Sequence, residues 1–188
     1  RLGVIVPSWN TVMEYECWRM APAGASIHSS RIAHTKRSVE TRLHTGAAAP
    51  QAAELLAHAQ VDAICFGCTG ASFAKLGIDQ EIIKNMEAVT KTPCTTTTTA
   101  IVDALRFLKA RSVAISSPYD EASNKRMMDF LAYSGFTAVS EKGLNLDHPA
   151  FLSPDLAYGV ARDANCPEAD AVIISCTNFR SLEVIEKL

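Results

Sequence analysis

Two cysteines, Cys68 and Cys176, occupy the same position in two copies of one short sequence pattern. The first copy is segment 62–70, D-A-I-C-F-G-C-T-G, and the second is segment 170–178, D-A-V-I-I-S-C-T-N. In each copy an apolar run typical of a strand buried on both faces precedes a small residue, a cysteine and a threonine. We therefore expect each cysteine at the carboxyl end of a strand, the edge of an open α/β sheet where ligands bind. Two thiols so placed suggest paired chemistry.

A thiolate at a junction between a strand and a helix is a plausible nucleophile. Backbone N–H groups and the helix dipole lower its pKa and raise the fraction of the reactive form. The competing interpretation is simple burial, which is common for cysteine. The repeat argues against burial alone, because the apolar positions vary between the copies while Cys-Thr is kept. The four cysteines without a repeat partner are interpreted as small hydrophobic residues: Cys17, Cys65, Cys94 and Cys166.

Cys65 and Cys68 have the C-x-x-C spacing that redox and zinc pairs also use. Side chains an odd number of residues apart point to opposite sides of a strand, so these two thiols are expected to diverge. The sequence holds no second C-x-x-C or H-x-x-x-H pair, and its five histidines lack ligand spacing. It also lacks the glycine-rich phosphate loops of nucleotide-binding proteins. Neither a metal nor an organic cofactor is predicted.

Strands and helices alternate along the chain. Alternation of this kind predicts right-handed crossovers and parallel sheets. Pro7 and Pro118 end strands 111 positions apart, and the two pattern cysteines lie 108 positions apart, so the whole arrangement repeats. Strands are expected at 2–6, 26–33, 62–68, 112–117, 137–139 and 170–175, with one more short strand in the run 94–99. Helices are expected at 47–59, 78–89, 100–108, 122–133 and 154–165, the third of them capped by threonine.

The predicted fold is α/β, with two pseudo-symmetric flavodoxin-like half-domains, parallel sheets and an active site in the cleft between them. The first half-domain is expected at residues 1–95 and the second at 96–188, with a hinge near 95–99. An amphipathic helix is expected to begin at Leu182. We expect a further C-terminal segment that returns to the first half to be absent from this sequence.

Composition narrows the classes of partner. The 188 residues carry a net charge of -2 with a pI near 6.2 and no basic run, which argues against nucleic acid or an anionic membrane. No apolar run is long enough for a membrane span.

Six cysteines without a secretory signal are expected to be free thiols in a cytoplasmic protein. The exposed edge of a half-built sheet favours a homo-oligomer.

Five segments in order together resemble maleate cis-trans isomerase. This family belongs to the aspartate/glutamate racemase superfamily, with the arylmalonate decarboxylases and hydantoin racemases. The resemblance spans nearly the whole chain and is carried by Val6–Thr11, Gly67–Thr69, Pro93–Thr97, Ser117–Tyr119 and Ser175–Arg180.

The resemblance implies a role for each cysteine. Cys68 would add to the double bond of maleate, and Cys176 would exchange a proton at the neighbouring carbon. Rotation about the resulting single bond and loss of the thiolate would give fumarate, without a metal or cofactor. The partner implied is a small dicarboxylate substrate.

The resemblance also implies a set of substrate-binding residues at the same sheet edges. Three side chains would hold the carboxylates, and two backbone N–H groups would complete the anion pockets. The chain departs from the family pattern at Trp9 and Gly70, where relatives often have serine. The implied binding residues are Asn10, Tyr119 and Asn145, with the N–H groups of Thr69 and Thr177.

Two other functions fit the same residues. A two-thiol racemase or arylmalonate-type decarboxylase would exchange a proton at an α-carbon without covalent addition. A catalytically inert protein that binds small acids is an alternative of a different class. A substrate adduct at Cys68 would distinguish the isomerase from the racemase or decarboxylase. Stabilisation by a ligand without turnover would indicate the binding protein.

Overall fold

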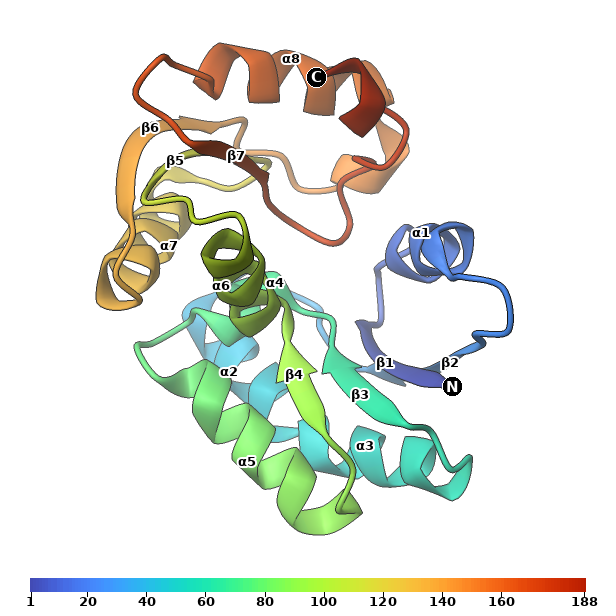
Figure 1. Cartoon of the computed structure of the whole chain (residues 1–188). Helices are drawn as coiled ribbons and strands as arrows, with labels where there is room; N and C mark the ends of the chain where they lie inside the picture. Colours follow the sequence, from blue (N-terminus) through green and yellow to red (C-terminus); the bar gives the residue numbers. More distant parts are fainter. The chain divides into compact units, whose positions relative to one another are not determined.

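The computed structural model describes residues 1–188 as two compact units, Arg1–Ala100 and Ile101–Leu188. The boundary falls inside helix α6 (Thr97–Phe107), a few residues after the position expected from the sequence. Each unit has a parallel sheet of its own with helices against it (Figure 1).

The first unit contains a sheet of four parallel strands in the order β2-β1-β3-β4. Its strands are β1 (Leu2–Pro7), β2 (Ile27–Ile32), β3 (Ala63–Phe66) and β4 (Cys94–Thr96). Its helices before α6 are α1 (Met13–Met20), α2 (Val39–Ala47), α3 (Ala49–His58), α4 (Thr69–Ser72) and α5 (Ile78–Thr90).

The second unit contains a sheet of three parallel strands in the order β6-β5-β7. Its strands are β5 (Ser112–Ser117), β6 (Thr137–Gly143) and β7 (Ala171–Ile174). Its helices are α7 (Glu121–Tyr133) and α8 (Pro154–Ala164), with short 3₁₀ turns η1 (Pro149–Phe151) and η2 (Ile185–Lys187). No helix of the structure has the length and apolar character needed to cross a membrane.

The sequence repeat extends to strand register. In the first unit Ile5 pairs with Phe66, and in the second Ser116 pairs with Ile174 at the corresponding position. Beyond each pair, the next N–H donates to the neighbouring strand at 2.8 Å, from Gly67 to the Ile5 carbonyl and from Ser175 to the Ser116 carbonyl. The shared inner strand order is that of flavodoxin-like folds. The predicted α/β class with two parallel sheets is confirmed.

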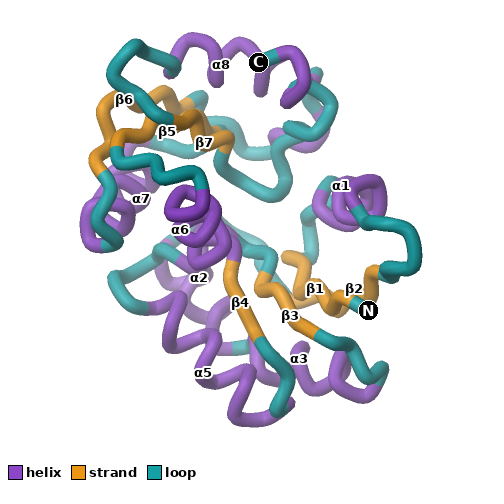
Figure 2. Tube along the Cα trace, in the orientation of Figure 1, coloured by secondary structure: helices purple, strands orange, loops and turns teal.

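The first sheet is buried on both faces, as its apolar strands predict. Ile5 packs with Leu56, Ile82 and other residues of α3 and α5, whereas Val4 and Val6 pack with Met13 of α1. Figure 2 shows α3 and α5 on one side of this sheet and α1 on the other. Alternate residues of a strand therefore pack into two separate hydrophobic cores, one on each face of the sheet.

Some elements differ from the prediction. Helix α1 was not predicted, because Tyr15, Trp18 and Met20 are exposed and blur the apolar periodicity. Helix α2 was also missed, since its buried face includes Arg42 and Thr45 rather than a row of apolar residues. The expected single helix at 47–59 is the end of α2 followed by α3.

Further differences lie near strand and helix ends. Helix α6 begins at Thr97, three residues before the predicted start, because the Thr96 hydroxyl accepts the Thr99 N–H at 3.2 Å and caps it. Strand β6 continues to Gly143, beyond the predicted 139. The helix expected from Leu182 is the 3₁₀ turn η2, in which the Lys187 N–H donates to the Val184 carbonyl three residues back.

Candidate active site

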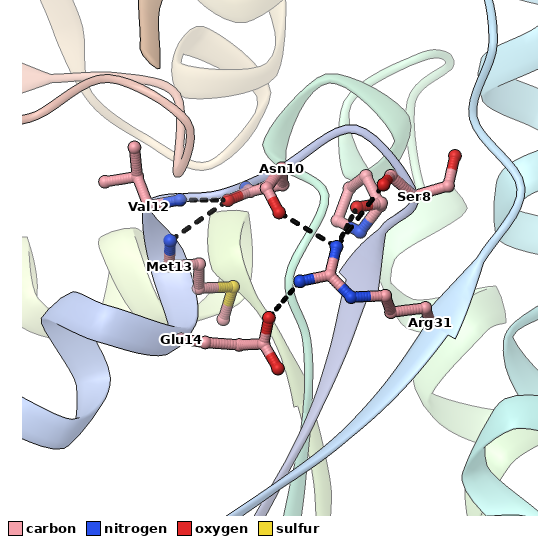
Figure 3. Close-up of polar contacts among 7 residues, drawn as sticks. Ser8, Asn10, Val12, Met13, Glu14 and Arg31 are labelled. Atoms are coloured by element: carbon pink, nitrogen blue, oxygen red, sulfur yellow. Dashed lines mark hydrogen bonds and ion pairs between the residues drawn. The ribbon is translucent and has the colours of Figure 1, made fainter. Parts of the chain in front are cut away.

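Asn10 lies just past the end of β1 and is 1% exposed. Its Oδ1 accepts the backbone N–H groups of Val12 and Met13 at 3.0 Å each, which starts helix α1 (Figure 3). Because these bonds identify the oxygen, the amide nitrogen is the atom through which Asn10 donates. Its predicted position at the carboxyl edge of the first sheet is correct.

Arg31 of β2 holds the loop that carries Asn10. Its Nη1 donates to the carbonyl of Asn10 at 2.9 Å and to that of Ser8 at 3.3 Å, and its Nη2 pairs with Glu14 (Figure 3). One guanidinium thus joins β2, the loop and α1. Arg31 was not among the residues predicted from the sequence, because a single arginine in an alternating strand carries no signal of such contacts.

Cys68 lies two residues beyond β3, where it precedes the short helix α4, and is 6% exposed. Its carbonyl accepts the N–H groups of Ala71 at 3.1 Å and Ser72 at 3.0 Å. Cys68 packs in the core beneath α3 and α5, whereas Cys65 packs against the core that contains Met13. The two thiols diverge as predicted, which argues against a C-x-x-C redox or metal pair.

Met13 connects the Asn10 loop with the Cys68 loop. Asn10 holds the backbone N–H of Met13, and the Met13 side chain lies against the α-carbon of Gly67. Thr69 follows Cys68 and is buried, and its carbonyl accepts the Ser72 hydroxyl at 3.0 Å. The first unit therefore brings Asn10, Cys68 and Thr69 to one edge of its sheet.

The second unit gathers its candidate residues in the same way. Tyr119 is 7% exposed, and its carbonyl accepts the N–H of Asn145 at 3.1 Å. The hydroxyl of Ser175, which precedes Cys176, donates to the Tyr119 hydroxyl oxygen at 3.5 Å. The ends of β5, β6 and β7 thus meet at Tyr119, Asn145 and Cys176, with Thr177 next in the chain.

Two of these residues have unusual backbone angles. Cys176 has φ +88° and Asn145 has φ +49°. Asparagine tolerates this region, but cysteine adopts it at a cost on the order of 1–3 kcal/mol. Strain of this kind concentrates at functional sites, so the conformation of Cys176 adds structural support for a role beyond packing.

Three of the four cysteines without a repeat partner have raised pKa values. Burial raises the pKa of the Cys65 thiol to about 12 and that of the Cys94 thiol to about 11, and it also raises the pKa of Cys17. Thiols with such pKa values are poor nucleophiles at neutral pH. All six cysteines are free thiols, and no group of three or more His, Cys, Asp or Glu side chains is placed to hold a metal ion.

The fold and the two strand-end cysteines define a class of α/β enzyme with one candidate thiol in each of two similar units. The chain belongs to the arylmalonate decarboxylase family, whose sequence profile matches residues 2–188.

Relatives in this family include curated maleate isomerases. The chain is 29% identical over 205 residues to maleate isomerase of Pseudomonas putida KT2440, a match that covers 100% of this chain and 82% of the relative. It is 24% identical over 208 residues to maleate isomerase of Geobacillus stearothermophilus, with the same coverage.

Solved structures agree with this grouping. Maleate isomerase Iso of Pseudomonas putida S16 has a TM-score of 0.92 at 25% identity, covering 100% of this chain and 82% of that one. Nocardia farcinica maleate cis-trans isomerase, solved as a cysteine-to-serine variant with a bound succinylcysteine intermediate, has a TM-score of 0.91 at 23% identity with the same coverage. The predicted resemblance and the classification as an enzyme of the isomerase group are confirmed.

Proposed function

We propose that this enzyme converts maleate, or a similar small cis-dicarboxylate, to its trans isomer without a cofactor. The observation that carries the proposal is the placement of Cys68 and Cys176 just past equivalent strands of two similar sheets. The proposal requires that the carboxyl edges of both sheets serve one substrate molecule.

Cys68 is the proposed nucleophile. Its thiolate forms a C–S bond at one alkene carbon of maleate, and the π electrons move to the other alkene carbon, stabilised by the attached carboxylate. Cys176 donates a proton to that carbon, which gives a succinyl thioether with a C–C single bond. After rotation, Cys176 removes a proton from the same carbon, the double bond re-forms and the C–S bond breaks.

The other candidate residues bind the two carboxylates in this proposal. The amide nitrogen of Asn10 donates to one carboxylate from the first unit, and Tyr119 and Asn145 contribute from the second. The backbone N–H groups of Thr69 and Thr177 add donors next to each cysteine. The succinylcysteine in the Nocardia farcinica structure supports a covalent route of this type, as a property of that protein.

Proton NMR of purified protein with maleate tests the activity. The expected result is loss of the maleate signal with equal gain of fumarate. Incubation of Cys176→Ser with maleate should add the mass of one maleic acid molecule to the peptide containing Cys68, and Cys68→Ser is the control without an adduct. Turnover of maleate without any adduct, or racemisation or decarboxylation in its place, would contradict the proposal.

A further inference from the structure

Arg42 of helix α2 is a buried arginine against the loop that carries Cys68. It is 3% exposed, and its guanidinium lies 6.0 Å from the centre of the Phe73 ring. Its Nε lies 3.2 Å, and its Cζ 3.5 Å, from the point that a β-carbon on Gly70 would occupy. Gly70 is two residues after Cys68, so a fixed positive charge is packed directly against the candidate nucleophile loop.

Trp9, His34 and Thr45 form a cluster of side chains beside helix α2, which also carries Arg42. His34 Nδ1 lies 2.8 Å from the Thr45 hydroxyl, which also donates to the Thr41 carbonyl inside α2. The Trp9 ring packs on His34 in an edge arrangement with the ring centroids 5.1 Å apart. Trp9 and Gly70, the two positions that depart from the family pattern, are thus both connected to helix α2, Trp9 through His34 and Thr45 and Gly70 through Arg42.

His34 adds no second charge to this cluster at neutral pH. Burial, with a smaller contribution from the charge of Arg42, lowers the pKa of His34 to about 4. A guanidinium removed from water exerts a stronger field than an exposed one, because solvent does not screen it.

We propose that Arg42 sets the charge specificity of the Cys68 site, favouring dianionic over monoanionic or neutral ligands, and that glycine at position 70 lets the guanidinium lie against the loop, since a side chain there would shift it. Arg42 acts in this proposal as a positioning residue for loop 67–70 and as a source of positive potential. The preference for a dicarboxylate rests on the proposed function, whereas the positive potential at Cys68 does not.

Alkylation of Cys68 tests the positive electrostatic potential at this thiol and does not require that the protein turn over a substrate. Iodoacetate is anionic and iodoacetamide is neutral, and both react by the same displacement of iodide by thiolate, so their rate ratio cancels the thiolate fraction. Mass spectrometry of the peptide containing Cys68 gives both rates. In the wild type we expect an iodoacetate-to-iodoacetamide ratio at least about fivefold above that of glutathione, and a decrease of that ratio in high salt.

Variants test whether Arg42 is the source of the raised iodoacetate-to-iodoacetamide ratio. Arg42→Leu is expected to lower the ratio to about that of glutathione, Arg42→Lys to keep it within about threefold of wild type, and Gly70→Ser to lower it partly. Arg106→Leu, which removes an arginine from an exposed ion pair with Asp103, is the matched control and should leave the ratio unchanged. A wild-type ratio no higher than that of glutathione overturns the proposal even if Arg42→Leu does not fold.

Steady-state kinetics test the substrate preference. Arg42→Leu should raise KM about tenfold or more for maleate, but about threefold or less for its half-amide maleamate, with kcat changed less than KM. Equal losses on both substrates would indicate a purely structural role and overturn the inference. If maleate is not turned over by the wild type, the proposed function fails, while the alkylation ratio still tests Arg42.

Discussion

The backbone carbonyl oxygen of Ile5 lies 2.7 Å from the point that a β-carbon on Gly67 would occupy. The same carbonyl accepts the Gly67 N–H at 2.8 Å, so β1 and the residue before Cys68 are in direct backbone contact. Met13 covers Gly67 from the side of α1. Only glycine fits at position 67 without movement of the backbone, which explains the glycine before Cys68.

Gly67→Ala is therefore expected to destabilise the protein by about 2–3 kcal/mol and to displace Cys68. Urea unfolding and an activity assay measure the two effects. Gly159→Ala is the matched control, because a β-carbon at position 159 meets no atom within 4 Å and alanine favours a helix. Wild-type stability in Gly67→Ala would show that the loop accommodates the methyl group easily.

Replacement of either pattern cysteine with serine should abolish turnover and leave the fold intact. Serine is close in size to cysteine but is far less acidic and a poor nucleophile toward an alkene. Circular dichroism and the fumarate assay separate folding from activity. Cys17→Ser and Cys166→Ser should keep activity, and retention of even about a tenth of the activity in Cys68→Ser would refute the covalent role.

The lowered pKa of His34 predicts that the folded protein loses stability in mild acid. The folded pKa near 4 lies below the unfolded value of 6.5, so the unfolded chain binds the proton more readily. The contribution of neutral His34 is complete above pH 6.5 and is lost as the pH falls toward 4, by a total of about 3 kcal/mol.

Chemical denaturation of wild type and His34→Gln at several pH values measures this effect. The variant should be less stable than wild type at pH 7.5 but should lose less stability between pH 6.5 and pH 4. Parallel stability curves for the two proteins would show that His34 does not control the acid response.

Asp170 joins the starts of two strands in the second sheet. Its Oδ2 accepts the backbone N–H groups of Arg111 and Ser112 at 2.8 Å each, which ties the start of β7 to the start of β5. Hydrogen bonds from these N–H groups lower the pKa of the Asp170 carboxyl. The carboxylate therefore contributes stability above pH 3.8, and this contribution is lost as the pH falls below that value.

Asp170→Ala should lower the midpoint of urea unfolding at pH 7, and the difference from wild type should shrink below pH 3.8. Asp163→Ala removes an exposed carboxylate that pairs with Arg162 and is the control. A shift in Asp163→Ala as large as that in Asp170→Ala would mean that net charge, not the strand contact, is responsible.

The sequence by itself determined the α/β class, the repeat and the strand-end positions of Cys68 and Cys176. These features are local, since apolar runs, turn residues and repeated patterns report strands and their ends directly. The equal register of the Ile5–Phe66 and Ser116–Ile174 pairs follows from the same repeat.

Only the tertiary structure decided which side chains contact the loops that carry Asn10 and Cys68. Arg31 reaches the carbonyls of the Asn10 loop, and Arg42 packs against Gly70, across separations in sequence that no periodicity records. Both are single arginines in polar segments, where sequence alone predicts exposure. The burial of Arg42 and the contacts of both arginines arise because parallel strands and their crossover helices bring distant loops to one sheet edge, which happens only in the folded chain.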